Sequence, residues 1–148
     1  MKLTIEHRDL FTVPYGYILC HCITADFALG AGIAKKFAEL GVRDALLQHY
    51  NEPYPYSWGG IGDCLFTEAT KWQGEYNLVT KEKCWHKPTE RTLRQALTVM
   101  LKLCDTDEKI AMPKIGCGLD KMKWETVEQL IREVFEDSDI EILVCDWK

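Results

Sequence analysis

One short segment of this sequence contains the residue types needed to hold an anion and to move a proton. Gly116 and Gly118 flank Cys117, and Asp120 follows two residues later. Glycines can adopt positive φ and let a ligand approach backbone N–H groups, which bind anions. A carboxylate repels phosphate but suits proton transfer or a hydrogen bond to a sugar hydroxyl. Asp120 is therefore a candidate acid or base, although it could instead cap the loop or begin the next helix.

A second glycine pair, Gly30 and Gly32, stands between an apolar run at residues 17–22 and a helical pattern that begins near Ala31. The segment at residues 116–118 has the same setting, because it follows the apolar run 109–112 and precedes a helical pattern at 124–135. A strand, a glycine loop and a helix in this order favour binding of a phosphate. An ordinary strand-to-helix turn is the alternative for each loop taken alone.

Lys81 ends another apolar run, which makes it a candidate nucleophile. A lysine at a strand end can point into a crevice, where partial removal from water makes its amine easier to deprotonate. Lys83 and Lys87 are close in sequence, and any of these lysines could simply be solvated. Cys117 could act as a nucleophilic thiol, but the spacing indicates no His–Cys pair, and a small loop residue is the simpler interpretation. His21, within an apolar run, is interpreted as a core histidine.

Strands and amphipathic helices alternate through the chain. Strands are predicted at residues 2–6, 17–22, 61–68, 75–81, 109–112 and 141–146, and helices at 31–40, 42–50, 90–104 and 124–135. Thr89 is a plausible N-cap for the third helix, and residues 51–60 form a loop whose Trp58 could cover a ligand or pack. This alternation predicts an α/β fold with a largely parallel sheet covered on both faces. Ligands bind at the carboxyl ends of such strands, so both glycine loops would face one crevice.

Length and composition limit the classes of protein. The chain has 148 residues, 47% of them hydrophobic, and we expect one domain over residues 1–148. A net charge of −5 argues against charge-driven binding to nucleic acid or to anionic membranes. We see neither the apolar core of a signal peptide nor a run of membrane-spanning length. Seven cysteines without a C-x-x-C pair indicate buried thiols in a reducing cytoplasm (or nucleus, in a eukaryote) and give little support to a structural zinc site.

The ordered set of short motifs resembles the macrodomains, which bind ADP-ribose. Within them it is most similar to the terminal ADP-ribose protein glycohydrolase group, which removes ADP-ribose from acidic side chains. The resemblance covers nearly the whole chain. Its motifs are Asp9-Leu10-Phe11, His21-Cys22-Ile23, Gly30 to Ala34, Leu78 to Lys81, His86 to Thr89, Met112 to Asp120, Trp124-Glu125 and Glu133-Val134-Phe135.

The resemblance implies a three-layer α/β/α sandwich with a central, mostly parallel mixed sheet, and it implies roles for individual residues. Lys81 and Asp120 match the lysine and aspartate that carry the chemistry in the glycohydrolase group. Asp9 matches the acidic residue that accepts from the exocyclic amine of adenine. The remaining ligand contacts would be Leu10, Thr24, Gly30, Ala31, Gly32, Ile33, Ile115, Gly116, Cys117, Gly118 and Leu119. Thr24 stands where the group often has serine, and Arg8 where macrodomains commonly have glycine.

Three functions follow from the resemblance. The first is hydrolysis of the bond between ADP-ribose and an acyl oxygen, on Asp or Glu side chains of proteins or on O-acyl-ADP-ribose. The second is a non-catalytic reader of ADP-ribose, which would need neither Lys81 nor Asp120. The third is removal of ADP-ribose from nucleic-acid bases, with nucleic acid only as the modified substrate. We expect the first, in a monomer that uses no metal or other cofactor.

Overall fold

The computed structural model describes residues 1–50, 60–118 and 120–147. Along the chain the elements are β1 (Lys2–Glu6), η1 (Leu10–Thr12), β2 (Ile18–Thr24), α1 (Gly32–Glu39), α2 (Val42–His49), β3 (Cys64–Thr67), β4 (Glu75–Lys81), α3 (Glu90–Leu103), β5 (Lys109–Pro113), α4 (Trp124–Phe135) and β6 (Glu141–Cys145). The strands form one sheet in the order β1-β6-β5-β2-β4-β3. Every neighbouring pair is parallel except β3 and β4, which are antiparallel.

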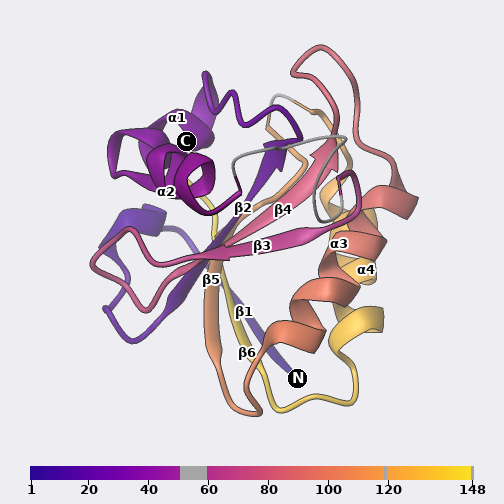
Figure 1. Ribbon diagram of the computed structural model, residues 1–148. Coiled ribbons are helices and arrows are strands. Elements are labelled where there is room, and N and C mark those ends of the chain that lie inside the picture. The colour runs from indigo at the N-terminus through magenta and orange to yellow at the C-terminus, as the bar shows by residue number, and fades with distance from the viewer. Residues whose placement is uncertain (51–59, 119, 148) are drawn as a thin grey trace.

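Helices cover both faces of this sheet, α1 and α2 on one side and α3 and α4 on the other (Figure 1). Alternate strand residues therefore face two separate apolar cores. Ile110, Met112, Ile142 and Val144 pack with α3 and α4, whereas Ala111 and Leu143 lie in the other core. The expected α/β class and three-layer arrangement with a mixed, mostly parallel sheet are confirmed.

The helix boundaries follow local signals in the sequence. Thr89 caps α3 by accepting a hydrogen bond from the Thr92 backbone N–H, as predicted. Gly41, with φ of 100°, ends α1 and begins α2. The prediction of a strand over residues 61–68 was too long, because Gly62 has φ of 92° and Asp63 N donates to Gly60 O across a turn. No helix in the described parts of the chain is both long and apolar enough to span a membrane.

Candidate functional site

A cleft of about 890 Å³ opens at the carboxyl ends of the parallel strands, and both glycine loops line it. Such a volume suits a ligand of nucleotide size. The structure places almost every predicted site residue on its walls: Asp9, Leu10, Thr24, Gly30, Ala31, Gly32, Ile33, Lys81, Ile115, Gly116, Cys117, Gly118 and Asp120. Leu119 and Trp58 lie outside the described residues.

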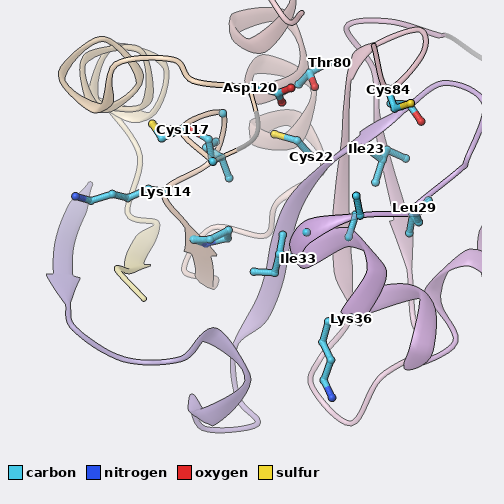
Figure 2. Close-up of a pocket in the computed structure, with 18 of the residues that line it drawn as sticks. Cys22, Ile23, Leu29, Ile33, Lys36, Thr80, Cys84, Lys114, Cys117 and Asp120 are labelled. Carbon is cyan, nitrogen blue, oxygen red and sulfur yellow. Dashed lines mark hydrogen bonds between the residues drawn. The ribbon is translucent and has the colours of Figure 1, made fainter. Parts of the chain in front are cut away.

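Lys81 and Asp120 meet at one end of this cleft. Lys81 is the last residue of β4, and its Nζ lies 2.5 Å from Asp120 Oδ1. The same amine donates to the backbone carbonyl of Cys84 at 3.2 Å. The two side chains are 12% and 15% exposed, so a ligand can reach a pair that is largely shielded from water. Figure 2 shows Asp120 at the end of the cleft where Thr80, the residue before Lys81, also lies.

The second glycine loop turns sharply to bring Asp120 to this position. Gly116 has φ of 75°, and its carbonyl accepts a hydrogen bond from Met122 N at 2.7 Å. Lys121 also has positive φ, 58°, and its N–H donates to Gly118 O. Of the two glycines that could adopt positive φ, Gly116 does so and Gly118 does not. The loop therefore closes on itself one residue after the carboxylate, which fixes the direction in which Asp120 points.

The first glycine loop presents the start of α1 to the cleft. Gly32 has φ of 60°, and Ala31 at the N-cap position has an extended backbone. No side chain in the described chain caps this helix. The N–H groups of its first turn are therefore available to an anionic ligand, and the helix dipole favours negative charge there.

Thr24 lines the cleft beside Lys81, and in the sheet these two residues are register partners after a bulge at Ile23/Thr24. Its hydroxyl donates to Asp26 Oδ1 at 2.5 Å. Asp26 also lies 3.5 Å from Lys83 Nζ, so this carboxylate connects the segment after β2 to the segment after β4. Asp26 could not be recognised from the sequence, because a single aspartate in a loop has many ordinary uses.

Asp9 lines the cleft and also caps η1, since its Oδ1 accepts from Phe11 N at 3.0 Å. Asp9 therefore also has a structural role as a cap, and its second carboxylate oxygen remains for a ligand. Arg8 bonds to Glu6 and to Thr12, and it does not line the cleft. Sequence reasoning missed Asp146 and Trp147, which follow β6 and line the cleft together with Asp9.

Lys114 is a further cleft residue that the sequence analysis overlooked. Its Nζ lies 3.2 Å from Asp146 Oδ2 and 5.7 Å from the ring centroid of Trp124. Figure 2 places Lys114 away from the Asp120 end. Its position next to the glycine loop was a usable signal, because basic residues beside such loops favour anions.

Three of the cysteines that line the cleft depart from the expectation of buried thiols, because Cys84 is exposed and Cys22 and Cys117 are half-buried. All seven cysteines are free thiols. Burial raises the pKa of Cys117, and it raises the pKa of Cys22 to about 12, so both thiols are protonated at neutral pH. His21 is fully buried, bonds through Nε2 to Asn77 Oδ1 at 2.6 Å and stacks on Phe37, as expected of a core histidine. No group of three or more His, Cys, Asp or Glu side chains in the described residues is placed to hold a metal ion.

The sheet lies between two helical layers, which defines an α/β sandwich. At the strand ends, two glycine loops and an amine–carboxylate pair line a large cleft that suits an anionic ligand. Comparison with known proteins gives the family. The model of the Macro domain matches residues 20–131, and the chain belongs to the Macro domain family.

Two relatives are each 38% identical to this chain over 151 residues, covering 97% of this chain and 90% of their own length. They are named ADP-ribose glycohydrolase OARD1, one from Bos taurus and one from Homo sapiens. Among solved structures, the macrodomain of Thermus aquaticus DarG is similar with a TM-score of 0.80, at 19% identity and 97% coverage of each chain. At that identity the structural likeness concerns the fold. The expected membership of the macrodomains is confirmed.

Proposed function

We propose that this chain is an ADP-ribosyl hydrolase that releases ADP-ribose from Asp and Glu side chains and from O-acyl-ADP-ribose. The observation that carries the proposal is the 2.5 Å contact between Lys81 Nζ and Asp120 Oδ1 inside the cleft. Two relatives that are 38% identical over nearly the whole chain are named ADP-ribose glycohydrolases, which supports the same activity here. A protein that only binds ADP-ribose needs the glycine loops but has no use for this pair.

The glycine loops would hold the pyrophosphate. One donor set is the first turn of α1, which begins at Gly32, and the other is the backbone around Gly116. Asp9 would accept from the adenine amine at the opposite end, and Leu10 beside it is buried and apolar. This arrangement leaves the distal ribose beside Lys81 and Asp120, where its anomeric carbon can react.

The chemistry begins with a proton transfer. Lys81 in its ion pair is an ammonium ion, and Asp120 accepts one proton to free the amine lone pair. The amine attacks the anomeric carbon, the carbon–oxygen bond to the acyl group breaks, and a carboxylate leaves with the bonding electrons. The adduct nitrogen releases its extra proton to solvent. A water molecule then forms a bond to the anomeric carbon as the carbon–nitrogen bond breaks, and the lysine nitrogen takes back the proton held by Asp120. The products are ADP-ribose, the free acidic side chain and the regenerated lysine.

The leaving group decides which links are cleaved. A carboxylate is a good leaving group, whereas the alkoxide of a serine link needs an acid placed on the leaving oxygen. The described cleft holds Asp120 next to the amine, and that carboxylate is already used to deprotonate Lys81 in this scheme. We therefore infer activity on ester-linked ADP-ribose and little activity on serine links.

The test is the release of ADP-ribose from glutamate-linked protein, serine-linked protein and thymidine-linked DNA, assayed side by side with the same enzyme. The proposal expects rapid release from the glutamate link and little from the serine link. Binding of ADP-ribose without release from any of the three would identify a reader. Release from the DNA alone would place the enzyme among the hydrolases of modified bases.

A further inference from the structure

The mouth of the cleft carries an exposed indole that the chemistry above does not use. Trp85 is 73% exposed and lines the cleft in the segment between β4 and α3. A single exposed aromatic residue on a protein surface needs no explanation by itself. Trp85, however, lies four residues after the proposed nucleophile Lys81, and several contacts hold its segment in place. These two features point to a role in substrate recognition.

Four contacts anchor the segment that carries Trp85. Lys81 Nζ donates to the carbonyl of Cys84, the residue immediately before the indole. Lys83 pairs with Asp26 in the segment after β2 at 3.5 Å, and its backbone N–H donates to His86 Nδ1 at 3.3 Å. The fourth contact is the Thr89 capping box at the start of α3, which fixes the far end of the segment. The indole is therefore presented from an ordered segment, and its ring packs edge-on against His86 at 5.6 Å.

The contact between Lys81 and Cys84 also locates the indole relative to the reaction. The amine that would attack the anomeric carbon touches the peptide group next to Trp85. Figure 2 shows Cys84 on the rim of the cleft, on the opposite side from Lys114. A group bound to the anomeric carbon and extending out of the cleft at this end passes the side chain of Trp85.

We propose that Trp85 is a specificity-determining residue that contacts the polypeptide carrying the ADP-ribosylated acidic side chain. This inference rests on the proposed hydrolase function and names the class of substrate. An acetyl group adds only a short chain beyond the ester oxygen, whereas a polypeptide continues outward and offers much more surface to the indole. Rigid aromatic side chains contribute large contact areas to peptide recognition at small entropic cost.

The charges around Trp85 favour a polypeptide over a nucleic acid. Lys81 and Lys83 pair with Asp120 and Asp26. The other charges between residues 82 and 91 cancel, because Glu82 and Glu90 are balanced by Lys87 and Arg91. The whole chain carries a charge of −5. A long polyanion would gain little here, because affinity for nucleic acid depends on neutralising its phosphates.

The experiment compares Trp85→Ala with wild type on three substrates: O-acetyl-ADP-ribose, a glutamate-ADP-ribosylated peptide and a thymidine-ADP-ribosylated oligonucleotide. Loss of one aromatic contact is expected to lower the ratio of kcat/KM for the peptide to kcat/KM for O-acetyl-ADP-ribose about ten-fold. Trp85→Phe is expected to restore most of the ratio, because it retains a ring. Trp147→Ala is the matched control, since it removes an exposed cleft indole at the adenine end and is expected to leave the ratio unchanged.

A binding measurement tests the role of Trp85 independently of catalysis. In the slow Asp120→Ala background, which keeps the contact between Lys81 and Cys84, calorimetry compares the affinity for the modified peptide with that for free ADP-ribose. Trp85→Ala is expected to reduce the extra affinity that the peptide contributes and to leave the affinity for ADP-ribose within about two-fold. An unchanged ratio and unchanged peptide affinity would overturn the role of Trp85, and a loss confined to the oligonucleotide would overturn the choice of a polypeptide. Failure of wild type to cleave any substrate would instead refute the hydrolase function.

Discussion

An ammonium group held by a carboxylate cannot attack carbon until it has lost a proton, so in the mechanism we propose Lys81 depends on Asp120. In that mechanism the proton would pass along their 2.5 Å contact, between two side chains that are only 12% and 15% exposed. The same carboxylate lies in a cleft that we propose holds a pyrophosphate, where its negative charge opposes binding. In this proposal Asp120 promotes the chemical step and weakens the binding of the ligand.

Replacement of Asp120 by alanine separates these effects. We expect Asp120→Ala to bind ADP-ribose as tightly as wild type or more tightly, because a nearby negative charge is gone. Turnover is expected to fall about 100-fold to 10,000-fold, the range for loss of a general acid or base. Calorimetry and single-turnover release of ADP-ribose measure the two quantities, and near-normal turnover would assign the proton transfer to another group.

His21 gives the fold a pH dependence that is independent of the proposed chemistry. Burial lowers its pKa from 6.5 to about 4, and the hydrogen bond with Asn77 only partly opposes the shift. Because the folded-state pKa is depressed, the unfolded chain binds more protons between pH 6.5 and pH 4, and stability is lost as the pH falls through this window. Above pH 6.5 the ring is neutral in both states and this loss is absent.

We expect His21 alone to reduce the free energy of unfolding by about 2 kcal/mol between pH 7.5 and pH 5. Urea denaturation of wild type and of His21→Gln at both pH values measures this contribution. The variant is expected to be less stable at pH 7.5 but to lose less stability on acidification. An equal loss in both proteins would assign the acid sensitivity to other groups.

At the level of elements, the sequence correctly predicted the helix boundaries that depend on local residue patterns. Helix α4 begins and ends where its apolar spacing indicated, and Thr89 caps α3 as its type and position suggested. The predicted extent of β3 was too long. The turn at Gly62 depends on a hydrogen bond from its N–H to the carbonyl of Val79, which lies on another strand. The Asp26–Lys83 pair and the exposure of Trp85 could not be predicted either, because both depend on how two loops meet in space.

The glycine loop at residues 116–118 offers a matched pair of variants. Gly116 has φ of 75°, and a Cβ there would lie 3.0 Å from Met122 Sδ, whereas a Cβ at Gly118 meets nothing within 4 Å. Gly116→Ala is expected to lower the free energy of unfolding by about 1 to 2 kcal/mol, and Gly118→Ala by less than about 0.5 kcal/mol. Urea denaturation compares them, and equal effects would show that the left-handed conformation of Gly116 is not required.

At the level of the whole molecule, two apolar cores share a single sheet. His21 in β2 packs on α1, while its neighbour Cys20 contacts Met100 in α3, so one strand carries both cores. We propose that residues 1–148 form one macrodomain. The fold class was predictable because alternating strands and helices allow few arrangements.

If the chain is one domain whose cleft binds ADP-ribose, it unfolds in a single transition that ADP-ribose shifts upward. At a concentration 100 times the dissociation constant, the ligand adds about 2.7 kcal/mol, or roughly 5 to 10 °C in Tm for a chain of this length. Calorimetric scans with ADP-ribose and with AMP as a control measure the shift. Two separate transitions would contradict the single domain, and an unchanged Tm at millimolar ADP-ribose would contradict the assignment of the cleft.

The central claim is that Lys81 forms a covalent bond to the distal ribose. The most direct measurement is mass spectrometry of the protein during slow turnover of a glutamate-linked substrate, with borohydride added to trap the adduct. We predict an ADP-ribose-derived adduct on Lys81, no release of ADP-ribose by Lys81→Ala with binding largely retained, and no rescue by Lys81→Arg, because arginine does not readily give up a proton. Full activity in Lys81→Ala, with no adduct on residue 81 of wild type, would contradict the account.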